Sequence, residues 1–505
     1  MTTAAHGKQV SLFPRRELGI LLHPTSLFGR EDVGTLGREA FAFVDWLEQA
    51  GVTLWQILPL TPNGLHNSPY FSASAFAGNP WLIDLEALGE HGLLEGYTPG
   101  PVHDARVPFA ELGDTKLPLL LAAAVTFLGM PNHPWWPAFR AFRASEPWLD
   151  YTAHFFALKE ALAGAPWWRW EPGLRERRPA AVARSRAALA HRIEVWEALL
   201  FFFEMQWRAL KTHANGKGIR ILGDLPIYVH HDSADVWRYA DQFRLGDGGR
   251  MIVQSGVPPD YFSETGQLWG NPIYDWSRMA LDGFSWWIAR LRRCVGLTDM
   301  VRIDHFRALS AYWEIPGDAE DARRGRWVPG PGQQFLATVA AHFPAMPFVA
   351  EDLGTLDQAV LELRDRNGLY GMRILQFGFD GLPDNVHRPD VFPAESIAYT
   401  GTHDNDTLLG WWKSLDAQQR AEVARYYQFS PAEAPGKVVW SLIEAAIACR
   451  SRVAVIPFQD LLVLDERARM NDPARFVGNW DWRLPPDGLS GELARSLRRL
   501  RDHYR

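Results

Sequence analysis

The sequence predicts an α/β protein built as a (β/α)8 TIM barrel with large insertions between the barrel strands. Three observations carry this prediction. Short apolar segments bounded by Gly, Pro and Asp recur along the chain, helical patterns fall between them, and several of the segments end in ionisable residues. A barrel with insertions can exceed 400 residues as one unit, so a chain of 505 residues fits this architecture.

Eight segments are predicted as parallel strands because they are almost continuously hydrophobic, as strands buried on both faces are. In chain order they are Leu18–His23, Leu54–Leu60, Ile219–Val229, Met300–Phe306, Phe348–Leu353, Met372–Phe377, Ser396–His403 and Val453–Leu461. The clearest helical patterns between them are Glu39–Ala50, Phe284–Val295, Gln333–His342 and Ala359–Asn367. Alternation of the two patterns predicts closure into a barrel.

Two connections are too long for simple crossovers, and we interpret them as insertions on one catalytic barrel spanning residues 1–505. The first covers approximately residues 61–215, after the second strand, and contains a long helical stretch near Arg178–Lys211. The second covers residues 230–283, after the third strand. It includes residues 257–272, whose Gly and Pro content excludes a regular helix and predicts an ordered loop over a site.

Composition narrows the function classes. The net charge is −7 and no basic block is long enough to follow a phosphate backbone, so we expect no nucleic-acid partner. Cys294 and Cys449 fit neither a disulfide framework nor a zinc pattern. The apolar run Leu18–Leu22 is too short for a signal peptide, and Leu117–Met130 is too short to span a bilayer, so we expect a cytoplasmic protein without membrane contact.

The aromatic content is high, with 23 Trp, 28 Phe and 13 Tyr. Flat rings with polar edges suit the faces of sugars, but core packing also explains most aromatic residues in proteins. Composition therefore leaves both readings open.

The stretch Asp299–Phe306 brings an apolar strand directly into ionisable side chains. Alternation along a strand places Arg302 and Asp304 on one face and His305 on the other. A cation this close favours the ionised carboxylate, as a nucleophile requires, so we expect Asp304 to stay charged. A structural ion pair at the end of a sheet is the alternative.

Four predicted strands end in ionisable residues, namely Asp224, Asp304, Glu351 and the pair His403 and Asp404. Catalytic groups of such barrels sit at the carboxyl ends of the strands, where these side chains would converge. Each alone could be a helix N-cap or a buried hydrogen-bond partner. Together they indicate glycosidic-bond chemistry, in which one carboxylate attacks the anomeric carbon and a second carboxyl protonates the leaving oxygen. Glu351 suits the acid, because apolar and acidic neighbours raise the pKa of a carboxyl.

Several segments carry a family resemblance. They are Asn67–Tyr70, Gly223–Val229, the segment from Tyr261 to Asn271, Arg302–Phe306, Arg326–Gly332, Ala350–Gly354, Gly401–Asn405 and Asn479–Arg483. In this order they resemble the amylomaltase (4-α-glucanotransferase) family of the α-amylase clan, over nearly the whole chain.

The resemblance implies a retaining mechanism with Asp304 as nucleophile, Glu351 as acid and base, and Asp404 as a third carboxylate that holds sugar hydroxyls. It also implies substrate contacts from Ser68, Tyr70, Asp224, Tyr261, Phe262, Gln267, Trp269, Arg302, His305, Phe377 and His403. One segment departs from the family pattern, since Asn471–Arg475 reads Asn-Asp-Pro-Ala-Arg where Asn-x-Pro-Gly-Thr is expected. This departure leaves a sugar contact near Asn471 unsupported.

Our main hypothesis is an intracellular enzyme that transfers a segment of an α-1,4-glucan to the 4-hydroxyl of a glucan or glucose. Malto-oligosaccharides, amylose or other α-1,4-glucans would be its substrates, and we expect a monomer or weak homo-oligomer. Tyr261, Phe262 and Trp269 could shield a glycosyl-enzyme from water, or could merely pin their loop to the barrel. A hydrolase of the same clan and a catalytically silent glycogen-binding barrel are the alternatives. No zinc, nucleotide, dinucleotide or serine-hydrolase motif is present, so we expect no metal and no cofactor.

Overall fold

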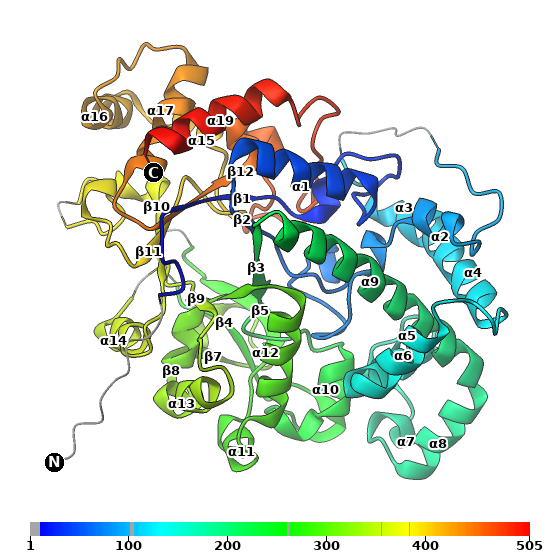
Figure 1. Cartoon of the computed structure of the whole chain (residues 1–505). Coiled ribbons are helices and arrows are strands. Elements are labelled where there is room, and N and C mark those ends of the chain that lie inside the picture. The colour runs from blue at the N-terminus through cyan, green and yellow to red at the C-terminus, as the bar shows by residue number, and fades with distance from the viewer. Residues whose placement is uncertain (1–10, 101–105, 260–262, 355, 383, 505) are drawn as a thin grey trace.

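The computed structural model describes residues 11–100, 106–259, 263–354, 356–382 and 384–504. Its centre is a parallel sheet of eight strands in the order β10-β11-β12-β1-β2-β3-β6-β9 (Figure 1). These strands are β1 (Glu17–Leu21), β2 (Leu54–Gln56), β3 (Arg220–Leu225), β6 (Met300–Ile303), β9 (Phe348–Ala350), β10 (Gly371–Ile374), β11 (Ser396–Tyr399) and β12 (Val453–Pro457). Each lies within one of the eight predicted segments or overlaps it, so the strand prediction is confirmed.

The two end strands of this sheet meet and close the barrel. Val349 of β9 forms a parallel bridge with Tyr370, and the N–H of Ala350 donates to the carbonyl of Tyr370 at 2.9 Å. The order along the sheet follows the order along the chain, with each strand beside the next barrel strand. The predicted (β/α)8 barrel is therefore confirmed.

Alternate strand residues supply two separate apolar clusters, as the two faces of a closed sheet should. Leu222, Met300 and Met372 belong to one cluster, which contains barrel-strand residues from all round the sheet. Trp55 and Val301 belong to the other, which also contains helical residues. The first cluster fills the barrel, and the second packs its outer face against the helices.

The helices that follow the barrel strands form the outer ring. They are α1 (Arg38–Ala50), α9 (Ala190–Gly216), α12 (Ser285–Leu297), α13 (Gly332–His342), α14 (Gln358–Arg366), α15 (Leu408–Ser414), α16 (Ala417–Tyr427), α17 (Pro435–Ala448), α18 (Phe458–Leu461) and α19 (Gly491–His503). α1 ends where Gly51 adopts a left-handed conformation (φ 74°), as glycine at a helix C-terminus commonly does. The four helical patterns predicted from the sequence correspond to α1, α12, α13 and α14.

The insertion after β2 is helical. Its helices are α2 (Leu85–Glu90), α3 (Phe109–Thr115), α4 (Leu117–Leu128), α5 (Trp136–Ser145), α6 (Pro147–Ala161), α7 (Pro172–Arg175) and α8 (Pro179–Ala188). They gather on one side of the molecule, next to α9 (Figure 1). Because α9 lies between the barrel and these helices, it buries apolar residues around its circumference, including Phe201, Phe202 and Phe203.

A second, antiparallel sheet was not predicted. It has the order β5-β4-β7-β8 and consists of β4 (Val253–Val257), β5 (Gln267–Pro272), β7 (Ala311–Pro316) and β8 (Arg326–Pro329). Two short helices, α10 (Ala234–Arg238) and α11 (Trp276–Leu281), flank its first two strands in sequence. The prediction of a loop over residues 257–272 is thus wrong for residues 267–272, which pair with β4 across a bulge. Our division of the chain into insertion subdomains stays a prediction.

Among the described residues, no helix combines the length and the apolar character needed to cross a bilayer. The apolar segment that begins at Leu117 forms α4, in which Leu120 and Phe127 are buried.

Candidate active site

Main-chain hydrogen bonds between β3, β6 and β9 continue one residue past the ends of these strands and fix the positions of Asp304 and Glu351. The N–H of Asp304 donates to the carbonyl of Leu225 at 3.0 Å, and the N–H of Glu351 donates to that of Ile303 at 3.0 Å. Asp304 and Glu351 therefore follow β6 and β9 directly, at the carboxyl end of the barrel. The structure thus places both predicted catalytic carboxylates at the same end of the sheet.

Arg302 joins two of the predicted site residues. Its Nη1 atom donates at 2.8 Å to both oxygens of Asp224, and its Nη2 atom lies 3.0 Å from Oδ1 of Asp304. The side chain of Asp224 is 0% exposed, whereas that of Asp304 is 25% exposed. Asp224 therefore binds the guanidinium of Arg302 on its buried side, and Asp304 contacts it on the side that is partly exposed to solvent. The predicted contact of Asp224 with sugar stays a prediction, and this geometry favours a supporting role.

Burial raises the pKa of Asp304 to about 8; Arg302 opposes the rise, and the nearby Asp224, Glu351 and Asp404 add to it. Our expectation that Arg302 keeps Asp304 charged is therefore wrong for the free site. The sequence shows the cation two residues away, but it does not show that the carboxyl group lies in a closed barrel among other acids.

Glu351 is held by two backbone donors. Its Oε2 atom accepts from the N–H of His305 at 2.6 Å, and its Oε1 atom accepts from the N–H of Leu353 at 2.9 Å. Burial raises the pKa of Glu351, while Arg302 and the two backbone hydrogen bonds lower it. The net rise agrees with the expectation for a general acid, although burial rather than neighbouring acids is its main cause.

The strand geometry ends at His305, which adopts a left-handed conformation (φ 47°) before the short helix Phe306–Leu309. This residue does not continue the alternation of β6, so the face assigned to His305 from the sequence does not apply. The ring of Trp269, on β5, meets His305 edge to face with centroids 4.8 Å apart. Burial lowers the pKa of His305 to about 3, which keeps the imidazole neutral.

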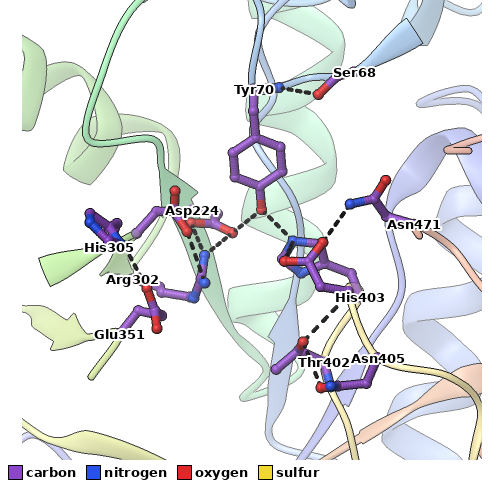
Figure 2. A network of polar contacts seen from close by, with 12 residues as sticks. Ser68, Tyr70, Asp224, Arg302, His305, Glu351, Thr402, His403, Asn405 and Asn471 are labelled. Atoms are coloured by element: carbon purple, nitrogen blue, oxygen red, sulfur yellow. Dashed lines mark hydrogen bonds and ion pairs between the residues drawn. The ribbon is translucent and has the colours of Figure 1, made fainter. Parts of the chain in front are cut away.

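Tyr70 links the two sides of the site. Its hydroxyl donates to Oδ2 of Asp224 at 2.7 Å and lies 2.9 Å from Nε2 of His403, as Figure 2 shows. The same nitrogen of His403 lies 3.4 Å from Oδ2 of Asp404, whose side chain is 42% exposed. Hydrogen bonds thus run from Arg302 through Asp224 and Tyr70 to His403, next to Asp404.

The sequence did not predict the role of Asn471. Its Nδ2 atom donates to Oδ1 of Asp404 at 2.6 Å, and its backbone N–H donates to the carbonyl of His403 at 3.0 Å. The ring of Trp480 lies 5.6 Å from that of Tyr70 and 5.8 Å from that of His403. Trp480 belongs to the Asn479–Arg483 motif used for the resemblance, and Asn471 opens the segment that departs from the family pattern, so both were singled out from the sequence without a role.

Three further predicted substrate residues lie within the described part of the chain, namely Ser68, Gln267 and Phe377. The Oγ atom of Ser68 accepts from the N–H of Tyr70 at 3.2 Å, and Oε1 of Gln267 accepts from Nε1 of Trp269 at 3.0 Å. Phe377 is 38% exposed, in the short helix Leu375–Gly378 after β10. Tyr261 and Phe262 lie outside the described residues.

Comparison with known proteins identifies similar chains over nearly the full length. Residues 22–489 match the model of a family described as 4-alpha-glucanotransferase. The 4-alpha-glucanotransferase of Thermus thermophilus is 46% identical over 493 residues, which cover 96% of this chain and 98% of that protein. The chloroplastic/amyloplastic 4-alpha-glucanotransferase DPE1 of Arabidopsis thaliana is 40% identical over 493 residues, covering 97% of this chain and 85% of the relative.

The fold has close counterparts among solved structures. An amylomaltase from Streptococcus agalactiae in complex with acarbose superposes with a TM-score of 0.92 at 36% identity, covering 97% of this chain and 99% of the other. An amylomaltase from Corynebacterium glutamicum shares the fold with a TM-score of 0.75 at 19% identity, covering 96% of this chain and 74% of that chain.

Proposed function

This chain belongs to the 4-alpha-glucanotransferase family, and from that premise we propose a retaining double displacement in which Asp304 is the nucleophile and Glu351 the acid and base. The enzyme is a 4-alpha-glucanotransferase. The observation that most supports the assignment of roles is the position of Arg302, which contacts Asp304 at 3.0 Å and leaves the side chain of Asp304 25% exposed.

In the first step, a carboxylate oxygen of Asp304 attacks the anomeric carbon of the donor glucan. The glycosidic C–O bond breaks, and Glu351 gives its proton to the departing oxygen, so that the released chain leaves with a hydroxyl group. Arg302 stabilises the ionised form of Asp304 before attack. A covalent glycosyl-enzyme results.

In the second step, the 4-hydroxyl oxygen of an acceptor attacks the same carbon. Glu351, now a carboxylate, takes the hydroxyl proton, and Asp304 leaves as a carboxylate. Two inversions restore the α configuration. Asp404 would hold sugar hydroxyls, and the exposure of its side chain supports this role.

Transfer requires that water be kept from the glycosyl-enzyme. Trp269, on β5, lies beside His305 and donates to Gln267 of the same strand, so this pair would cover one side of the bound sugar. We therefore propose that this hairpin favours sugar acceptors over water. His305 and His403, both held neutral by burial that lowers their pKa values, would donate or accept hydrogen bonds without adding charge.

The substrates we propose are malto-oligosaccharides, amylose or other α-1,4-glucans. We propose that the enzyme is cytoplasmic. We also propose that it is a monomer or weak homo-oligomer, and light scattering of the purified protein would measure this oligomeric state.

Incubation with maltotriose alone tests the proposed reaction. Transfer predicts glucose together with a ladder of oligomers longer than maltotriose. Glucose and maltose without a ladder would instead identify a hydrolase.

A further inference from the structure

The carboxylate of Asp404 is held on one side by residues 469–480, a segment of the connection between β12 and α19. The Nη2 atom of Arg469 donates to the carbonyl of Asp404 at 2.5 Å, and its Nε atom donates to the carbonyl of Asn471 at 2.8 Å. The backbone N–H of Asn471 donates to the carbonyl of His403 at 3.0 Å.

These contacts fix the backbone, and one side-chain contact acts on the carboxylate itself. Nδ2 of Asn471 donates to Oδ1 of Asp404 at 2.6 Å (Figure 2 labels Asn471 beside His403). Oδ2 lies 3.4 Å from Nε2 of His403, and the side chain of Asp404 is 42% exposed. One oxygen of Asp404 therefore accepts from the amide, and the carboxylate remains partly exposed to solvent.

An amide has the chemistry that this position needs. Its N–H donates at any pH because it does not ionise, and it brings no charge to a site that already holds several carboxylates. A hydrogen bond to a charged acceptor is stronger than one between neutral groups, so it can define a rotamer. We propose that Asn471 is a positioning residue for the transfer reaction, which orients Asp404 through its amide so that the carboxylate is set for the sugar hydroxyls. This inference rests on the proposed role of Asp404.

The departure from the family pattern does not affect the residue that contacts Asp404. The residues that differ are Ala474 and Arg475, and neither contributes a contact to Asp404. Arg475 pairs instead with Asp472 at 3.2 Å, whereas Asn471, where this chain matches the pattern, makes the contact.

Asn479 offers a matched control in the same segment. Its Oδ1 atom accepts from the N–H of Asp472 at 2.8 Å, and its Nδ2 atom donates to the carbonyl of Arg475 at 2.8 Å. It shapes the segment as Asn471 does, but no hydrogen bond joins it to Asp404.

The experiment compares Asn471→Ala, Asn471→Asp, Asn479→Ala and Asn479→Asp by kcat and KM on maltotriose between pH 5 and pH 9. Asn471→Ala should lower kcat about 10- to 100-fold, the loss of a charge-assisted hydrogen bond, with a small change in KM. Asn471→Asp should be closer to the wild type at pH 5 than at pH 9, because the introduced carboxyl group can donate only while protonated.

The charged and titratable groups around this contact include His403, Arg469, Asp472, Asp304 and Tyr70. All of them remain in the Asn471 and Asn479 variants, so a pH dependence specific to Asn471→Asp reports the substitution. Neither Asn479 variant should show it. A wild-type kcat in Asn471→Ala, or a pH profile of Asn471→Asp parallel to that of Asn479→Asp, would overturn the inference.

Asp404→Asn separates this inference from the proposed mechanism. An inactive Asp404→Asn variant together with active Asn471 variants would refute the positioning role alone. An active Asp404→Asn variant would overturn both the positioning role of Asn471 and the proposed role of Asp404, and would leave the assignments of Asp304 and Glu351 to the trapping experiment.

Discussion

One nitrogen of the Arg302 guanidinium, Nη1, donates to both oxygens of Asp224, at 2.8 Å each. Both oxygens of the buried Asp224 carboxylate therefore have a partner before any substrate binds. The other terminal nitrogen of Arg302 remains for Asp304. A cation already oriented beside the proposed nucleophile would spare the enzyme the reorganisation that water would need during attack.

The pH dependence of kcat/KM should be bell-shaped. Two carboxyl groups that interact closely lose their protons as a pair, and the productive form has one proton, on Glu351. Burial raises the pKa values of both Asp304 and Glu351, so the alkaline fall in activity, when the last proton leaves the pair, should come at a higher pH than for ordinary carboxyl groups. It should also fall in acid, when Asp304 is protonated as well.

A glucosyl fluoride donor isolates the acidic limb, because its leaving group needs no proton. With this donor, Glu351→Gln should show only the rise of activity with increasing pH that reports ionisation of Asp304. A basic limb that survives in this variant would contradict the assignment of the acid.

Removal of the Tyr70 hydroxyl should slow catalysis more than it weakens the fold. Tyr70→Phe breaks the hydrogen bond to the Asp224 carboxylate, 2.7 Å long, and the contact with His403. We expect kcat/KM to fall about 10- to 100-fold, as for loss of a hydrogen bond to a charged group.

The control is Tyr399→Phe. The buried hydroxyl of Tyr399 donates to Gln56 at 2.8 Å, so this substitution should cost about 1 kcal/mol of unfolding free energy and leave kcat/KM near the wild type.

Trp269→Ala should change the partition between transfer and hydrolysis. The indole covers His305 and lies 6.2 Å, centroid to centroid, from Tyr228, so its loss opens the site on the side of β5. Chromatography of the maltotriose products should show more maltose and glucose and a shorter ladder. An unchanged ladder would mean that this ring only anchors the hairpin.

Asp352 should matter for stability rather than chemistry. Its side chain is 0% exposed, pairs with Arg364 and, at 3.2 Å, with Arg373, and accepts from the N–H of Met372 at 2.6 Å. Asp352→Asn leaves two largely buried cations without their counter-charge, so we expect a loss of about 3–5 kcal/mol in unfolding free energy, measured by denaturant titration.

The matched control is Asp365→Asn, which removes the other partner of Arg364. That carboxylate is 63% exposed, so its loss should cost at most about 1 kcal/mol. Equal effects of the two variants would argue against a special role for the buried pair.

The barrel and its carboxylates could be predicted because a periodic pattern encodes them. Parallel strands bring their carboxyl ends to one edge, so Asp304 and Glu351 converge whatever the length of the connections between them. The contact between Asn471 and Asp404 could not be predicted in this way, since it joins an irregular segment to a turn 67 residues away.

The second sheet escaped prediction for a related reason. β4 and β5 precede β6 in the chain, whereas β7 and β8 follow it, and Gly and Pro in the first hairpin obscure the alternation of a strand. The charge on Asp304 was misjudged because sequence shows a neighbouring cation but not burial. Local pattern thus predicted which strand ends carry the candidate reacting groups, whereas long-range packing sets the pKa values of those groups.

Trapping of the glycosyl-enzyme tests the central claim most directly. Glu351→Gln, incubated with an α-glucosyl fluoride and no acceptor, should accumulate a covalent glucosyl adduct that mass spectrometry of the digested protein locates on Asp304. The double variant Asp304→Asn with Glu351→Gln should show no adduct and retain the wild-type circular dichroism spectrum. An adduct on any other residue, or none in the single variant under these conditions, would contradict the assignment of Asp304 as the nucleophile.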